Sequence, residues 1–224
     1  MDQPVPLSPI TVDVVSDVVC PWCYLGKRRL EHAIARVPEI PVEIRWRPYS
    51  LDPTVPREGE DRAAHIIRKF GSLAALDEGH RRLTDLGRAE GITYNFDRIT
   101  RSPNTLEAHR VGRWAADAGK GEAMVERLFA AYFSEGRDVG DHAVLASLAS
   151  EVGLSGANIA ARLERDDDSD AVRAEIEDAY RIGVTGVPCF ILGGKYGVVG
   201  AQSVEAIVQA IRRVAGEVAA PPSS

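Results

Sequence analysis

Residues 16–27 read SDVVCPWCYLGK, and the hydrophobic period of the chain changes within them. Just before them, residues 11–15 are rich in β-branched side chains, which predicts a short buried strand. From Trp22 onward the apolar residues recur at helical spacing, until prolines at 38 and 41 end the helix. Residues 42–47 then alternate between apolar and charged, which predicts a second strand. The chain therefore opens as a βαβ unit, with two cysteines where the first strand meets the helix.

The spacing of these two cysteines predicts thiol–disulfide chemistry. Cys20 ends the strand and Cys23 lies one helical turn later, so the two sulfurs are close enough to form a bridge. The unpaired N–H groups and the positive end of the helix dipole favour a thiolate on Cys20. Pro21 suits the first helical position, where its missing N–H has no cost. We expect Cys20 to be an exposed, ionised nucleophile and Cys23 the more buried resolving thiol.

Other uses of the cysteine pair fit the sequence less well. A zinc site needs two further ligands, but the third cysteine, Cys189, stands alone and no His pair has metal-ligand spacing. A purely structural disulfide would close a loop of four residues and stabilise little through chain entropy. We therefore expect no metal and no permanently bound cofactor.

The rest of the chain predicts a helical insertion followed by a ββα unit. Residues 61–182 show mainly helical periodicity, and glycines at 91, 136, 153 and 183 suit the left-handed position that follows a helix. Val187–Leu192 and residues 196–199 read as two strands joined by a Gly-Gly turn. Ser203 then caps a last helix. The economical α/β architecture is one sheet built from both halves of the chain, with a helical domain inserted between them.

Composition limits the classes of partner and the compartment. The chain has 224 residues and a net charge of -6, which argues against nucleic acid or an anionic membrane as partner. No apolar run has the length of a membrane span. The first ten residues hold three prolines and no basic residue, unlike a secretory signal, so we expect a cytoplasmic location. The oligomeric state does not follow from the sequence.

Four segments resemble the DsbA-like FrnE family, in the order expected for it. They are the motif segment 16–27, residues 104–110 (NTLEAHR), residues 183–188 (GVTGVP) and residues 200–202 (GAQ). The resemblance implies a thioredoxin-like domain formed by residues 1–60 and 183–218, with an inserted helical domain over 61–182. The end of the chain, residues 219–224, is expected from its own sequence to be a flexible tail. It implies a protein disulfide oxidoreductase that acts on a thiol- or disulfide-containing protein or small molecule.

The same resemblance suggests which side chains contact the substrate. Val187-Pro188 corresponds to the cis-proline that faces the dithiol in thioredoxin-like proteins, where an extended substrate segment pairs with the Val187 backbone. Asn104 and His109 lie in a segment that packs over the active site in this family, and we expect them to line it. Pro21 and Trp22 are expected to contact the substrate directly.

Two other functions remain open on the same scaffold. The related kappa-class glutathione transferases and hydroxychromene carboxylate isomerases carry Ser where this chain has Cys20, so the retained pair favours redox exchange. A glutathione-dependent isomerase or transferase is one alternative, and a non-catalytic redox-sensing or chaperone module is the other. Glutathione is a candidate redox co-substrate in either enzymatic case.

Three further residues have two interpretations each. Asp17 is either a proton acceptor near the buried thiol or the cap of a turn. Cys189 is either a third redox thiol or, as its apolar neighbours favour, a core residue. Arg110 has a weaker claim to line the site than His109.

Overall fold

The computed structural model describes residues 9–219, and its centre is a four-stranded mixed sheet. The strand order is β2-β1-β5-β6. Strand β1 is parallel to β2, as a βαβ unit requires, whereas β1 and β5, like β5 and β6, are antiparallel. The bounds are β1 Ile10–Ser16, β2 Val42–Pro48, β5 Cys189–Leu192 and β6 Tyr196–Val199. Both ends of the chain therefore contribute to one sheet, as predicted.

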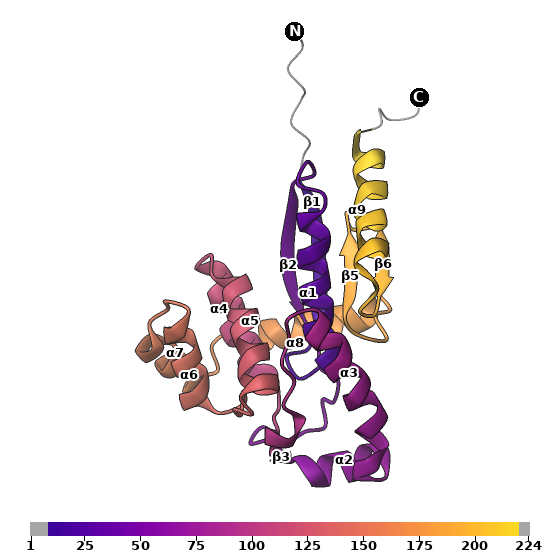
Figure 1. Ribbon diagram of the computed structural model, residues 1–224. Coiled ribbons are helices and arrows are strands. Elements are labelled where there is room, and N and C mark those ends of the chain that lie inside the picture. Colours follow the sequence, from indigo (N-terminus) through magenta and orange to yellow (C-terminus); the bar gives the residue numbers. More distant parts are fainter. Residues whose placement is uncertain (1–8, 220–224) are drawn as a thin grey trace.

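Two helices lie side by side on one face of the sheet, and a third covers part of the other. Helices α1 (Pro21–Ala35) and α9 (Val204–Ala219) bury a shared apolar core against β1 and β5 (Figure 1). On the opposite face, α8 (Ser169–Arg181) contacts β2 and packs Ala179 near Val15 and Cys189. The sequence assigned α8 to the inserted helical domain, but this helix also covers the sheet.

The insertion is helical, as predicted, and most of it lies beyond one end of the sheet (Figure 1). Its α-helices are α2 Arg62–Phe70, α3 Asp77–Ala89, α4 Leu106–Asp117, α5 Gly121–Phe129, α6 His142–Glu151, α7 Gly156–Leu163 and then α8. Short helical turns are η1 Leu73–Leu76, η2 Phe96–Arg98 and η3 Ala130–Ser134. Two short strands, β3 (Glu60–Asp61) before α2 and β4 (Arg101–Ser102) before α4, pair with each other over two residues. Such short strands leave no period in a sequence.

Element ends follow the predicted signals with small shifts. The four glycines expected after helices all have positive φ, between 72° and 86°. Strand β5 begins at Cys189, two residues later than predicted. Ser203 Oγ accepts a hydrogen bond from Ala206 N at 3.2 Å and so caps α9. This helix includes Ala219, and the rest of the predicted tail lies outside the described residues.

Aromatic packing connects the motif helix to the insertion. Tyr24, one residue after the second cysteine, stacks on Phe129 with ring centroids 5.1 Å apart, and Tyr94 meets its edge at 6.0 Å. The motif cysteines belong to the same buried cluster as the insertion helices. The insertion is therefore part of the environment of the thiols. Within residues 9–219, no helix is both long and apolar enough to cross a membrane.

Candidate active site

Cys20 occupies the position that caps the N-terminus of α1. Its backbone is extended (φ -91°, ψ 110°), and its N–H donates to the Asp17 carbonyl at 3.0 Å. Its carbonyl accepts from Cys23 N at 3.0 Å, which begins the helix, and Pro21 is the first helical residue. Both cysteines are free thiols. The junction therefore places Cys20 among the unpaired N–H groups of the first turn and Cys23 one turn behind it.

The expected exposure of Cys20 is wrong. Only 3% of Cys20 is exposed, and 1% of Cys23. The Cys20 thiol donates to the carbonyl oxygen of Val187 at 3.6 Å, and the insertion covers the motif from the other side. Cys20 nevertheless lines a cavity of about 410 Å³, whereas Cys23 does not. Cys20 is therefore accessible through a cavity and not at an open surface.

The Cys23 thiol lies in surroundings that keep it protonated. Burial raises its pKa well above the ordinary value, and the hydrogen bond and the charge of Cys20 raise it further. The Ser16 hydroxyl and the Asp17 backbone act in the opposite direction but do not compensate. The two thiols therefore differ in access, and the more enclosed Cys23 is held in its protonated form.

Alkylation of the reduced native protein should modify Cys20 alone. Only Cys20 faces the cavity, and a Cys23 with a raised pKa has almost no reactive thiolate at neutral pH. Raising the pH should bring in Cys23 only well above the ordinary range of a thiol. Iodoacetamide labelling followed by peptide mass spectrometry measures both. As a control, protein unfolded in urea should be labelled on all three cysteines, and native labelling of Cys23 before Cys20 would contradict the assignment.

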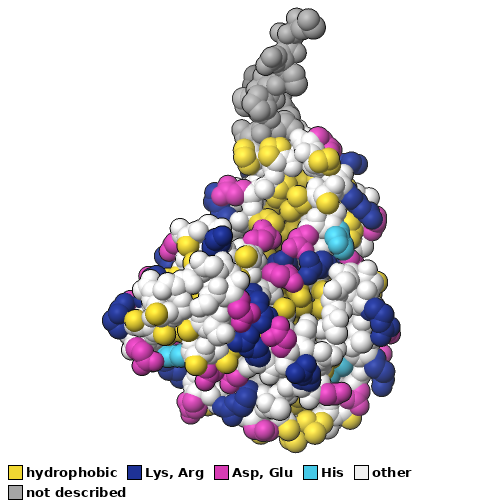
Figure 2. Space-filling model, turned by 60° about the vertical axis from the view of Figure 1, so that its left-hand side comes forward, with side chains coloured by type: hydrophobic (Ala, Val, Ile, Leu, Met, Phe, Trp, Pro, Cys, Tyr) yellow, Lys and Arg dark blue, Asp and Glu magenta, His cyan; other side chains and the backbone are white. Residues whose placement is uncertain are grey.

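One wall of the cavity is largely apolar. Trp22 is half-buried and lines the cavity together with Pro21 and Val187; their contact with a substrate stays a prediction. Leu51 and Phe70 line it further out and are themselves partly exposed, at 40% and 49%. Figure 2 shows one group of apolar side chains at the lower end of the molecule, the level of α2, and another higher on the same face, with charges of both signs between them. An apolar entrance therefore leads to the thiol.

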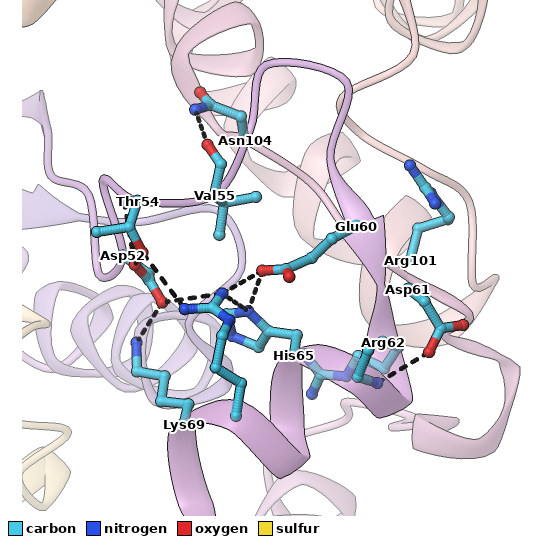
Figure 3. Close-up of polar contacts among 12 residues, drawn as sticks. Asp52, Thr54, Val55, Glu60, Asp61, Arg62, His65, Lys69, Arg101 and Asn104 are labelled. Atoms are coloured by element: carbon cyan, nitrogen blue, oxygen red, sulfur yellow. Dashed lines mark hydrogen bonds and ion pairs between the residues drawn. The ribbon is translucent and has the colours of Figure 1, made fainter.

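Polar side chains of α2 also line the cavity (Figure 3). Lys69 Nζ lies 3.5 Å from a carboxylate oxygen of Asp52, and His65 Nδ1 lies 2.8 Å from one of Glu60. Arg68 pairs with the same Glu60. These contacts hold the loop before β3 against the helix, so the polar wall is a connected network.

The Val187–Pro188 peptide is cis, and it faces the motif helix. A Cβ added to Gly26 would lie only 2.7 Å from Pro188 Cγ, so only glycine allows α1 to lie this close to the proline. Pro188 O accepts from Gly200 N at 2.7 Å, which secures the segment on its far side. Val187 lines the cavity and Pro188 supports it from behind.

Asn104 and His109 do not line this cavity. Asn104 Oδ1 accepts from Leu106 N at 3.0 Å, and its amide donates to Val55 O at 2.8 Å, so it secures the start of α4 against the cavity wall. His109 Nε2 lies 3.0 Å from Tyr49 O and faces a second hollow of about 490 Å³. Their contribution to substrate binding stays a prediction.

Asp17 connects these two sides of the motif segment. It is buried, lines the Cys20 cavity, and accepts from Leu51 N at 2.7 Å. Its other oxygen is 3.6 Å from His109 Nε2 and 3.4 Å from Val19 N. The carboxylate therefore caps the turn before Cys20, and its role as a proton acceptor stays a prediction.

A protein-family model and several solved structures are similar to this chain. The model of the DsbA-like thioredoxin domain matches residues 11–212. The chain belongs to the DsbA-like thioredoxin family. YwbO, an uncharacterized protein of Bacillus subtilis, is 31% identical over 82% of this chain and 87% of its own length. A probable DsbA oxidoreductase of Streptomyces coelicolor is 33% identical, with a TM-score of 0.87, covering 96% of this chain and 93% of that one.

More distant DsbA-like folds include both oxidoreductases and an isomerase. The cytosolic disulfide reductase DsbM of Pseudomonas aeruginosa, solved with glutathione, is 22% identical with a TM-score of 0.62 over 93% of this chain and 96% of its own. A 2-hydroxychromene-2-carboxylate isomerase is 17% identical with a TM-score of 0.71 over 92% of this chain and 97% of its own. At these identities the likeness concerns the fold alone. The fold is thus that of a DsbA-like thiol oxidoreductase, with Cys20 and Cys23 adjacent.

The contact of Tyr94 with the motif was not predicted from the sequence, whereas the interpretation of Cys189 as a core residue agrees with the structure. The Tyr94 hydroxyl donates to the Pro21 carbonyl at 2.6 Å, and burial together with the nearby Cys20 raises the pKa of Tyr94 far above its usual range. No local pattern marks Tyr94, because it lies within the loop between α3 and η2. Cys189 is buried in β5, and burial raises its pKa, as expected of a core residue. Among residues 9–219, no group of three or more metal-binding side chains comes together.

Proposed function

We propose that this chain is a FrnE-like protein disulfide oxidoreductase that exchanges a dithiol for a disulfide at the Cys20-Pro21-Trp22-Cys23 motif. The observation that supports it most is the asymmetry of the pair. Cys20 caps the helix and faces the cavity, whereas Cys23 lies behind it with a raised pKa. The chain also keeps both cysteines, whereas the related isomerases and kappa-class glutathione transferases carry Ser at the position of Cys20.

In the reductive direction the exchange has two steps. The Cys20 thiolate attacks one sulfur of the substrate disulfide; that S–S bond breaks, and the first substrate thiolate leaves and takes up a proton. Cys23 then loses its proton and attacks the Cys20 sulfur, which releases the second substrate thiolate. Two electrons have passed from the dithiol to the substrate, and a Cys20–Cys23 disulfide remains. The oxidative direction is the reverse.

Glutathione is the co-substrate that we propose for restoring the dithiol, with a cytoplasmic site of action. Two glutathione molecules reduce one Cys20–Cys23 disulfide and leave as glutathione disulfide. A structurally similar reductase, DsbM, is described as cytosolic and was solved with glutathione. The partly exposed Leu51 and Phe70 offer apolar surface to a protein or hydrophobic small-molecule substrate.

Turnover of insulin disulfides in the presence of glutathione tests this function. We expect reduction by the wild type, and loss of turnover in both Cys20→Ser and Cys23→Ser, because each thiol takes part in one of the two steps. Cys189→Ser is the matched control and should retain turnover. If Cys20→Ser still converted a small-molecule substrate in a reaction that requires glutathione, the protein would instead be an isomerase or transferase. Protection of an aggregating client with both motif cysteines replaced, without turnover, would show a chaperone module.

A further inference from the structure

Most charges that line the Cys20 cavity already have partners within the protein. Asp52 pairs with Lys69, and His65 contacts Glu60. Asp17 accepts from Leu51 N and lies next to His109. His80 stacks on the ring of Phe96, and burial together with the charge of Arg62 lowers its pKa, so this imidazole is neutral. These groups contribute little free charge to the cavity.

Arg62 differs from them. This half-buried first residue of α2 lines the same cavity as Cys20. Its guanidinium donates to the Tyr132 hydroxyl at 3.5 Å, the limit of a hydrogen bond, and no carboxylate among residues 9–219 lies within 4.0 Å of it. The remaining N–H groups of Arg62 therefore have no anionic acceptor in the described protein.

Tyr132 does not supply the missing negative charge. Burial raises the pKa of Tyr132 to about 12, although Arg62 opposes the rise, so the hydroxyl is neutral at physiological pH. It donates its own hydrogen to Arg101 O at 3.1 Å. The phenol oxygen thus offers Arg62 one weak, uncharged contact.

A guanidinium in this position is suited to a carboxylate. Arginine presents a planar fork of donors that binds two carboxylate oxygens at once, and a partly buried site strengthens the pair. A cavity of about 410 Å³ also accommodates a small molecule better than a folded chain segment.

We propose that Arg62 binds a carboxylate of a low-molecular-weight disulfide or thiol substrate while its sulfur reacts with Cys20. This assignment rests on the proposed exchange function and adds to it: besides a protein disulfide, the same site takes small, carboxylate-bearing sulfur compounds, the chemical class of the proposed glutathione co-substrate. Arg62 acts on the substrate at a distance from the exchanging sulfurs, and selects it by charge.

Two aromatic disulfides that differ in charge test the proposal on the full-length reduced protein. Dithiobis(nitrobenzoate) carries two carboxylates, and dithiodipyridine carries none at neutral pH. The readout is the ratio of the two second-order rate constants, each divided by that of a free small thiol. In Arg62→Gln we expect this ratio to fall about tenfold or more, because a charge-assisted hydrogen-bond pair is lost. Arg62→Lys keeps the charge but not the fork and should fall in between.

Arg81→Gln is the matched control. Arg81 is an exposed cation of the neighbouring α3 that does not line the Cys20 cavity, so its removal should leave the ratio at the wild-type value. An unchanged ratio in Arg62→Gln would overturn the proposal. Equal losses with both disulfides would overturn it too, since they show a structural role. A charge preference seen only with a disulfide-bonded acidic peptide would overturn the small-molecule assignment.

Binding without chemistry separates this inference from the exchange function. A variant with both Cys20 and Cys23 changed to Ser cannot exchange disulfides, yet it retains Arg62. Calorimetric titration with thiodiglycolate, a sulfide with two carboxylates, should give a binding signal that Arg62→Gln removes. Binding here together with a wild type that reacts with neither disulfide would reject the exchange function alone. Absence of binding together with normal exchange would reject the Arg62 assignment alone.

Discussion

A Cys23→Ser variant will accumulate substrate joined to Cys20 through a mixed disulfide, approaching one adduct per chain. The cavity that serves Cys20 is unaltered by the change, so the first attack proceeds. The second step then fails, because a serine hydroxyl one turn behind is not a thiol that can attack the mixed disulfide. Non-reducing electrophoresis and intact mass spectrometry measure the adduct, and a reductant should release it. Identification of the released thiol names the substrate.

Two companion variants make the trapping experiment decisive. Cys20→Ser should form no adduct under the same conditions, because Cys23 is buried away from the cavity and its pKa is raised. Cys23→Ser combined with Cys189→Ser should trap as much substrate as Cys23→Ser alone, since the Cys189 side chain is buried in β5. Adducts on Cys23 or Cys189 in place of Cys20 would contradict the assigned nucleophile.

Replacement of Arg110 by Met is expected to produce the largest loss of stability, about 3–5 kcal/mol. The Arg110 side chain has 0% exposure. It donates to the carbonyl oxygens of residues 162, 165 and 167 at 3.0, 2.5 and 2.7 Å, and it pairs with the buried Glu107. Removal takes the Arg110 donors from three carbonyls, one in the last turn of α7 and two in the turn that follows it. Glu107 then keeps only Arg57, which is half exposed, at 3.0 Å.

Urea unfolding followed by circular dichroism measures this loss, provided that the slope with denaturant stays unchanged. Arg173→Met is the matched control, because Arg173 pairs with Asp170 only on the exposed surface of α8 and should unfold close to the wild type. Arg110→Lys should recover part of the stability, since one ammonium cannot reach all of these acceptors. A loss below about 1 kcal/mol in Arg110→Met would contradict the structural role assigned to it.

Local patterns predicted the parts of this structure that depend on neighbouring residues. The strand, the proline at the first helical position and the spacing of Cys20 and Cys23 all lie within a few residues of one another, and the structure has them as expected. The glycines after helices were identified for the same reason, because their left-handed backbone is a local requirement. The sheet formed from both ends of the chain was predicted because a βαβ unit opens the chain and a ββα unit closes it.

Features that depend on distant contacts were not visible in the sequence. The burial of Cys20 depends on Val187 and on the insertion, and the contact of Tyr94 with the Pro21 carbonyl spans 73 residues. Arg110 was considered as a weak candidate for the site, but its surroundings are the carbonyls of a loop more than fifty residues away. Arg62 was not singled out, because only the fold shows which cations lack a carboxylate.

The separation between Cys20 and Val187 also affects how the protein is made. The two residues that meet at the thiol are 167 positions apart in the chain. Ribosomes add about 5–20 residues per second, so roughly ten to thirty seconds pass between the synthesis of the first and the second. During that interval the thiols of the nascent chain have no cavity around them and meet whatever oxidants and thiols surround the ribosome. The redox state of Cys20 and Cys23 at the time of folding is thus set by the surroundings of the ribosome, before the cavity has formed.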